Sequence, residues 1–274
     1  MAMVLVGDRP LLASVDQIVA GRHVDLETTP PEAVGRKAIT RSLSDVAAMA
    51  GRPLALLVTV TLPRDFGHDR ATAMFDAMRA AARRYGCPLV GGDIAIHAGS
   101  SSPLVCTVTV LAEPGPAGAV GRSGARAGDT LYVTGRLGGS LQPDGQGRHL
   151  TFEPRIEEAL SLAEQLNDRL HAMIDISDGL GRDAAHLARR SGVCIEIDAH
   201  RIPCTGGLDW RRAMSDGEDY ELCFAVGEGL PPRLDGVSVT EVGRVIGRAG
   251  PPFVMVRDGS ETIDAADLGW EHRS

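Results

Sequence analysis

The sequence predicts a two-domain protein of mixed α+β and α/β class. Its 274 residues suit two domains, because single domains usually have about 100–200 residues. Both halves combine apolar residues at helical spacing with short β-branched runs that are typical of strands. The segment 113–121 is nearly uncharged and rich in Pro, Gly and Ala, as domain boundaries often are. We therefore expect an N-terminal domain at 1–118 and a C-terminal domain at 119–274.

The composition is that of a chain with a sizeable apolar core. Hydrophobic residues make up 43% and charged residues 23% of the chain. The net charge of −8 argues against a general nucleic-acid binder, because phosphate contacts need clustered Lys and Arg. The longest apolar run, Leu54–Leu62, is shorter than the roughly 20 residues that span a bilayer. The N-terminus also lacks a signal-peptide pattern, so we expect a cytoplasmic protein that binds neither nucleic acid nor membrane.

The first half predicts strands and two helices. Residues 1–25 are expected to form strands with a turn at 7–10. Thr29 and Glu32 have the spacing of a capping box, and proline suits the first helical position, so a helix should run from there toward Met49. The other elements predicted here are a buried strand at 54–62, a helix from 71 to 86, and strands at 88–96 and 104–112.

The second half predicts short strands, two helices and a long loop. Residues 136–149 are glycine-rich and have few apolar side chains, which indicates a loop. Met173–Ile176 should form a short strand, and the helix that follows it should end near Gly192. The remaining predicted elements are strands at 129–135, 193–197 and 220–226 and a helix at 154–166.

Acidic residues recur in one setting, at or just beyond the end of an apolar element and beside small residues. For any one of them alone, a helix cap or a turn is the better interpretation. As a set they also suggest a cation site, because carboxylates about 4 Å apart repel by roughly 4 kcal/mol at an effective dielectric constant of about 20. All-oxygen ligation suits Mg²⁺, which also bridges to substrate phosphates. These residues are Asp16, Asp45, Asp93, Asp175, Asp178, Glu218 and Asp219.

Two glycine-rich segments are candidates for close approach to a phosphate. They are Gly91-Gly92 and the loop between Gly135 and Gly147. Neither matches a Walker or a dinucleotide-binding pattern. An ordinary surface loop is the favoured interpretation of the second segment.

Seven motifs occur in one order along the chain. They are Ser14-Val-Asp16-Gln-Ile-Val-Ala-Gly-Arg-His23, Ser42-Leu-Ser-Asp45-Val-Ala-Ala-Met49, Val90-Gly-Gly-Asp93, Arg122-Ser-Gly-Ala-Arg-Ala-Gly-Asp129-Thr-Leu-Tyr-Val-Thr-Gly135, Ile174-Asp-Ile-Ser-Asp-Gly179, Gly217-Glu-Asp-Tyr-Glu-Leu222 and Gly269-Trp-Glu-His272. Each is moderately specific, and the ordered set is highly specific. Together they resemble the thiamine-monophosphate kinase family over residues 1–272.

The resemblance implies a fold, an assembly and a reaction. The fold would be that of the aminoimidazole-ribonucleotide synthetase and selenophosphate synthetase group. In that fold an N-terminal α+β domain, which mediates dimerisation, precedes a C-terminal α/β domain. The chain would form a homodimer with ATP near the dimer cleft. It would transfer the γ-phosphate of ATP to thiamine monophosphate with Mg²⁺ and without a covalent enzyme intermediate, giving thiamine diphosphate.

The resemblance also implies roles for individual residues. Metal ions would be held by Ser14, the main chain of Val15, Asp16, Asp45, Asp93, Asp175 and Asp178, and the catalytic residues among them would be Asp45, Asp175 and Asp178. ATP would contact Gly92, Asp93, Arg122 and Ser177. The thiamine phosphate would contact His23, Glu218 and Trp270. An aromatic ring such as that of Trp270 can stack on the cationic thiazolium.

The chain departs from the family pattern in three places. Family members have a G-D-D-A-A segment before the first strand, and it supplies two metal-binding aspartates. Met1 corresponds to a position just after that segment, so we expect a shortened N-terminus that lacks these aspartates. The pattern G-G-D-T-T-R becomes Gly91-Gly-Asp-Ile-Ala-Ile-His97, and G-D-S-x-x-G becomes Gly138-Gly-Ser-Leu-Gln-Pro143. Three hypotheses stay open. They are a thiamine-monophosphate kinase, a same-fold phosphotransferase with another acceptor, and a nucleotide-binding protein without catalysis.

Overall fold

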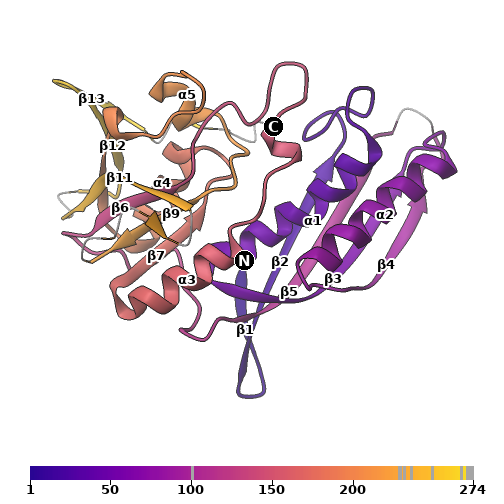
Figure 1. Ribbon diagram of the computed structural model, residues 1–274, viewed down its shortest axis with the longest axis horizontal. Coiled ribbons are helices and arrows are strands. Elements are labelled where there is room, and N and C mark those ends of the chain that lie inside the picture. The colour runs from indigo at the N-terminus through magenta and orange to yellow at the C-terminus, as the bar shows by residue number, and fades with distance from the viewer. Residues whose placement is uncertain are drawn as a thin grey trace. The chain divides into compact units, whose positions relative to one another are not determined.

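The computed structural model describes residues 1–99, 102–227, 230, 233–234, 237–247, 250–265 and 268–269. Its contacts divide the chain into two units (Figure 1). Unit 1 contains Met1–Val46, Gly51–Pro114 and Gln142–Pro154, and unit 2 contains Ala47–Ala50, Gly115–Leu141 and Arg155–Ser274. Both contain helices and strands, as the predicted mixed class requires. The domain boundary after residue 118 stays a prediction, because the division by contacts is not a single cut of the chain.

Unit 1 is a five-stranded sheet with two helices on one face (Figure 1). The strand order is β1-β2-β5-β3-β4, in which β3 and β4 are parallel and all other neighbours are antiparallel. The strands are β1 (Ala2–Val6), β2 (Arg9–Val19), β3 (Gly51–Leu62), β4 (Leu89–Ile96) and β5 (Val105–Pro114). The helices are α1 (Pro31–Ala48) and α2 (His68–Arg84).

The alternation of side chains along β3 explains where the core of unit 1 lies. Successive strand residues point to opposite faces, and Leu56 and Val58 are buried while Leu57 between them is 39% exposed. The helices cover the buried face with apolar side chains of their own. Fully buried examples are Val34, Ile39, Leu43, Met74 and Met78. The face with Leu57 is covered by neither helix (Figure 1).

Two predictions for this half are wrong in detail. Helix α1 begins at Pro31, so proline does occupy the first helical position. The capping box is not formed, because Thr29 Oγ1 is buried and makes no hydrogen bond to the described residues. Strand β3 begins at Gly51, three residues before the predicted start at Leu54. The strand accommodates Pro53, which has no N–H to donate, at a shift of register between Pro53 and Ala55.

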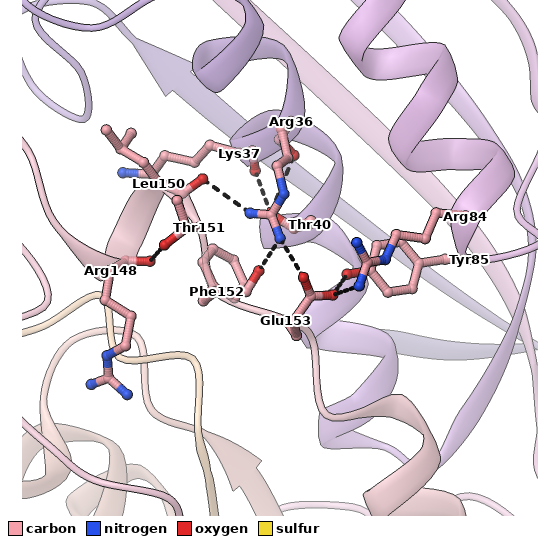
Figure 2. A network of polar contacts seen from close by, with 10 residues as sticks. All are labelled: Arg36, Lys37, Thr40, Arg84, Tyr85, Arg148, Leu150, Thr151, Phe152 and Glu153. Carbon is pink, nitrogen blue, oxygen red and sulfur yellow. Dashed lines mark hydrogen bonds and ion pairs between the residues drawn. The ribbon is translucent and has the colours of Figure 1, made fainter.

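Residues Gln142–Pro154, which we call the strap, return to unit 1 and lie on α1 (Figure 2). The Arg36 guanidinium donates to the carbonyl oxygens of Leu150 at 3.0 Å and Phe152 at 2.6 Å. It also pairs with the Glu153 carboxylate at 2.9 Å. Most of the strap falls in the predicted loop, whose sequence shows no periodicity that would indicate docking on a helix.

Unit 2 is built on an eight-stranded sheet. The strand order is β13-β12-β8-β11-β6-β9-β7, and β10 pairs with β11. The strands are β6 (Thr130–Thr134), β7 (Leu170–Asp175), β8 (Cys194–Asp198), β9 (Leu222–Val226), β10 (Arg233–Leu234), β11 (Val237–Ile246), β12 (Val254–Asp258) and β13 (Glu261–Asp264). The helices are α3 (Ile156–Leu166), α4 (Leu180–Ser191) and α5 (Trp210–Ser215), with short 3₁₀ segments η1 (Arg148–Leu150, in the strap), η2 (Asn167–Arg169) and η3 (Ala199–Arg201).

Helix α4 is the central helix of this unit, since it contacts β7, β8, β9, β12 and α5. Its stripe of Leu180, Ala184 and Leu187 is fully buried, as the helical spacing predicts. The helix ends at Gly192, whose φ of 69° lies in the left-handed region that favours glycine. Helix α5 and the strands after β9 were not predicted. Most of them are short, but β11 has ten residues and was missed despite its length. No helix in the described part of the chain is long and apolar enough to span a membrane.

Candidate functional site

Ser14 and Asp45 join β2 to α1 in unit 1. Ser14 Oγ donates a hydrogen bond to the Asp45 carboxylate. Asp16 is two residues further along β2 and therefore points to the same face as Ser14. Its carboxylate lies 3.5 Å from the Nε atom of Arg41, one helical turn before Asp45. Three predicted metal ligands thus meet at the contact between β2 and α1. Asp16 and Asp45 lie inside their elements, although the sequence suggested positions at the ends.

The Val15 side chain and Asp93 lie apart from this group, whereas the metal contact predicted for the main chain of Val15 stays a prediction. The Val15 side chain points to the opposite face of β2 and is 63% exposed. Asp93 lies on β4, and two strands, β5 and β3, separate β4 from β2. Three strand spacings amount to roughly 14 Å, so the Asp93 carboxylate is not within contact distance of Asp16. Its Oδ1 accepts a hydrogen bond from the backbone N–H of Ile94 at 2.9 Å.

Gly92 is required by the sheet itself. A Cβ atom at this position would overlap the carbonyl oxygen of Val58 on the neighbouring strand. The adjacent Gly91 has no such restriction, since its nearest neighbour would be a flexible Leu57 carbon at 3.5 Å. Close packing of β3 and β4 therefore accounts for the second glycine of the motif, whether or not a phosphate also approaches it.

His23 lies in the turn that follows β2. The backbone N–H of Val19 donates to His23 Nδ1 at 3.0 Å, and the backbone N–H of His23 donates to the Val19 carbonyl at 3.0 Å. The Lys37 ammonium donates to the carbonyl oxygen of His23 at 2.9 Å. The imidazole is therefore held by its own turn, and the turn is held by α1. No motif or spacing in the sequence had singled out Lys37.

Three carboxylates lie close together in unit 2. Asp175 ends β7, Asp178 precedes α4, and Asp183 lies in the first turn of α4. Asp183 accepts hydrogen bonds from the backbone N–H groups of Ser177 and Asp178, each at 2.9 Å. Burial raises the pKa of Asp183 well above its usual value, and the nearby charges of Asp175 and Asp178 raise it further. Sequence reasoning missed Asp183, because acidic residues are common in the first turn of a helix and its burial cannot be read from the sequence.

The loop with Glu218 lies against the loop with Ser177. The Glu218 N–H donates to the Ser177 carbonyl at 2.7 Å, and the Tyr220 N–H donates to the Ile176 carbonyl at 2.8 Å. Glu218 and Tyr220 have φ values of 66° and 53°, which are uncommon for residues other than glycine. Such backbone geometry concentrates at functional sites. Asp178, Ser177 and Glu218, which the sequence assigned separately, are thus neighbours in unit 2.

Asp219 and Glu221, which follow Glu218 in the sequence, have structural partners. Asp219 is buried and accepts hydrogen bonds from Gly138 N at 2.9 Å and from the Ser140 hydroxyl. Glu221 is buried and pairs with Arg155 through two bonds of 2.8 Å. Asp219 therefore belongs with the turn residues that the sequence analysis allowed for, and it holds the glycine loop that departs from the family pattern.

Arg122 and Asp178 lie near the same helix, α4. Both act electrostatically on His186 of that helix. Burial lowers the pKa of His186 first, Arg189 and Arg122 lower it further, and Asp178 opposes them. The Ser191 hydroxyl donates to the Arg122 carbonyl at 3.4 Å, which ties the segment before β6 to the end of α4. Trp270, the remaining predicted site residue, lies outside the described residues.

The oxygen atoms of the acidic group in each unit suit Mg²⁺ as ligands. Carboxylates and the Ser14 hydroxyl are hard oxygen donors of the kind that Mg²⁺ prefers. In unit 2, a cation would also relieve the mutual repulsion of Asp175, Asp178 and Asp183. Within either unit, the described residues include no set of three His, Cys, Asp or Glu side chains already arranged around one ion. The metal roles therefore stay predictions.

Two family models match the chain. The model of the AIR synthase related protein, N-terminal domain, matches residues 1–113, and that of the C-terminal domain matches residues 126–250. Curated relatives named thiamine-monophosphate kinase also match. The relative from Rhodopirellula baltica is 36% identical and the match covers 89% of this chain and 79% of the relative. The relative from Aquifex aeolicus is 34% identical, with 96% and 88% covered.

Solved structures agree with these matches. One described as AaThiL complexed with AMPPCP and TMP has a TM-score of 0.80 and 31% identity, covering 99% of this chain and 90% of that chain. The thiamine monophosphate kinase from Aquifex aeolicus has a TM-score of 0.76 at 33% identity, with 90% and 87% covered. The hydrogenase maturation protein HypE, at 20% identity and a TM-score of 0.78, shares the fold. Since family models and relatives together span most of the sequence, the chain belongs to the thiamine-monophosphate kinase family of phosphotransferases with the AIR synthase-like fold.

Proposed function

We propose that the protein transfers the γ-phosphate of ATP to thiamine monophosphate. A phosphate oxygen of the acceptor attacks the γ-phosphorus, the bond from that phosphorus to the β,γ-bridging oxygen breaks, and ADP and thiamine diphosphate are formed. The observation that supports this best is the grouping of Asp178, Ser177 and Glu218 in one part of unit 2. The AaThiL relative, whose structure was obtained with AMPPCP and TMP, also supports it.

The acidic residues are proposed as the magnesium ligands. They are Asp16, Asp45, Asp93, Asp175 and Asp178, with the Ser14 hydroxyl and the main chain of Val15. When bound, Mg²⁺ neutralises phosphate charge and orients the transferring group. The residues themselves have a simpler task, which is to remain ionised and hold their oxygens toward the ion. The bond from Ser14 to Asp45 supports this, because it fixes the carboxylate on α1 relative to β2.

The substrate contacts are proposed by position in the family motifs. For ATP they are Gly92, Asp93, Arg122 and Ser177, and for the acceptor they are His23, Glu218 and Trp270. A guanidinium suits phosphate because its planar fork donates two parallel hydrogen bonds. Catalysis would then rest on alignment and charge neutralisation, with Asp45, Asp175 and Asp178 as the catalytic carboxylates.

We also propose that two copies join through the uncovered face and edge of the unit 1 sheet. Among the described residues, most large apolar side chains that are exposed lie on β1 to β4, including Leu5 at 73%, Val15 at 63% and Ile96 at 67%. An apolar sheet surface of this kind is usually buried in an interface. The reaction is expected in the cytoplasm, where ATP is available.

A direct product assay tests the activity. Purified protein is incubated with ATP, Mg²⁺ and thiamine monophosphate, and thiamine diphosphate is measured by chromatography. Product that needs Mg²⁺ and disappears in Asp45→Asn is the expected result. The matched control is Asp76→Asn, which changes an exposed carboxylate on α2 that pairs with the nearby Arg79.

The other outcomes separate the remaining hypotheses. Absence of product with intact Mg²⁺-dependent ATP binding would favour another acceptor, which a panel of phosphorylated acceptors would then identify. Absence of both product and ATP binding would exclude the kinase proposal for this chain. Unchanged ATP affinity in Asp45→Asn would remove Asp45 from the metal site while leaving the reaction in place.

A further inference from the structure

Lys37 is a fully buried lysine at the centre of a polar chain in unit 1. Lysine is almost never fully buried unless its ammonium is paired. Here the ammonium donates to the carbonyl oxygen of His23 at 2.9 Å and lies 2.7 Å from Nδ1 of His149. One side chain of α1 thus contacts both the turn after β2 and the strap. Figure 2 shows Lys37 next to Arg36, which anchors the other end of the strap.

The direction of each hydrogen bond around Lys37 is fixed. An ammonium group can only donate, so His149 Nδ1 must be the acceptor. The ring proton of His149 then lies on Nε2, which is 3.1 Å from the carbonyl oxygen of Gly145. His149 is itself fully buried. The order is therefore Lys37 to His149 to the Gly145 carbonyl on one side, and Lys37 to the His23 carbonyl on the other.

A second contact joins the strap to the same stretch of chain. Gln146 Nε2 donates to the carbonyl oxygen of Thr28 at 2.9 Å. His23 and Thr28 belong to the connection between β2 and α1. The strap therefore fixes this connection at two points, through Lys37 near its beginning and through Gln146 near its end.

The orientation of the His23 ring follows from the same geometry. Because Val19 N–H donates to Nδ1 at 3.0 Å, the neutral ring has its proton on Nε2. An N–H at that position is a donor of the type that a phosphate oxygen accepts. The direction of this donor depends on the backbone of residue 23, and Lys37 holds the carbonyl of that residue.

We propose that Lys37 and His149 are positioning residues that orient His23 toward the phosphate of the acceptor. The inference rests on the proposed function, in which His23 contacts the acceptor. Neither Lys37 nor His149 need touch substrate. Their effect is to restrict the conformations of the His23 turn before the acceptor binds. Less conformational entropy is then lost when His23 is oriented for the reaction.

Steady-state kinetics test the proposal. Lys37→Met keeps the length of the side chain and removes the donor, and His149→Phe removes the acceptor. Each should raise the KM for the acceptor by about tenfold or more, as expected for loss of a charged hydrogen bond, and leave the KM for ATP within about twofold. His149→Asn retains an acceptor near the position of Nδ1 and should recover most of the loss.

The matched control is Thr40→Val on the same helix. Thr40 is as buried as Lys37, and its hydroxyl bonds only locally, to the Arg36 carbonyl at 3.2 Å and the Lys37 carbonyl at 3.5 Å. Its loss should leave both KM values unchanged. Equal increases in the two KM values for Lys37→Met, or the same acceptor effect in Thr40→Val, would mean that Lys37 only stabilises the fold.

A double-mutant cycle shows whether Lys37 acts through His23. If it does, Lys37→Met should add little to the acceptor KM of His23→Ala, because the group it orients is already gone. If the fold-increases in acceptor KM of the two single variants multiply in the double variant, the proposal is overturned.

Nuclear magnetic resonance tests the geometry without any activity. Long-range ¹H–¹⁵N spectra should assign the Nε2–H tautomer to His23 and His149, and Lys37→Met should shift the ring signals of both. An unchanged His23 ring in Lys37→Met would refute the positioning role even if thiamine diphosphate is formed. If no thiamine diphosphate is formed but the His23 signals shift as expected, the proposed acceptor is wrong and the positioning inference stands.

Discussion

At the scale of single residues, Gly92 shows how a motif residue can serve the fold. Gly92→Ala should destabilise unit 1 by about 2 kcal/mol or more, because the added methyl overlaps the Val58 carbonyl and backbone must move. Chemical denaturation without nucleotide measures this loss. Gly91→Ala is the control, since its methyl meets only a flexible Leu57 carbon at 3.5 Å. Equal stability of the two variants would contradict the structural role of Gly92.

At the scale of elements, the strap depends on Arg36 for its position on α1. Arg36→Met removes the donor to Leu150, Phe152 and Glu153 at once (Figure 2). The strap should then open more often, and trypsin should cleave after Arg148 about tenfold faster or more. Arg79→Met is the control, because Arg79 is an exposed residue of α2 paired with Asp76. Cleavage at the parental rate in Arg36→Met would show that other contacts hold the strap.

At the scale of the whole molecule, the proposed dimer depends on the uncovered face of the unit 1 sheet. Leu57→Glu places a charge on that face, where Leu57 is 39% exposed. The variant should elute as a monomer of 28.9 kDa, because burying an unpaired carboxylate in an apolar interface is costly. Light scattering during size exclusion measures the mass.

The control for this experiment is Thr72→Glu, at an exposed position on α2. It should leave the mass at twice that of the monomer. A monomeric parent protein, or loss of the dimer in both variants, would contradict an interface at the uncovered face of the sheet.

Local periodicity made most of the elements predictable. The spacing of Leu180, Ala184 and Leu187 identified α4, and the left-handed Gly192 ended it where expected. Both signals act between residues that are close in sequence, so they are visible without a fold. The capping box failed because the spacing of Thr29 and Glu32 does not reveal whether the hydroxyl reaches a backbone N–H.

The motifs made the family predictable, and the matches over residues 1–113 and 126–250 confirm it. The sequence also identified Ser14, Asp45, Ser177 and Glu218 as candidates, and the structure brings them into pairs. It did not reveal Asp183, which looks like any other acidic residue in a first helical turn until its burial beside Asp178 is known.

By itself, the sequence determined most of the elements, the mixed fold class and the family, since these follow from local patterns and from motif order. Only the tertiary structure decided which residues meet. The separation of Asp93 from Asp16 depends on strand order. The hydrogen bonds of Lys37 to His23 and His149 also depend on the fold, since Lys37 and His149 are 112 positions apart in the sequence. Contacts of that kind arise from packing between distant segments, and local residue patterns contain little information about such packing.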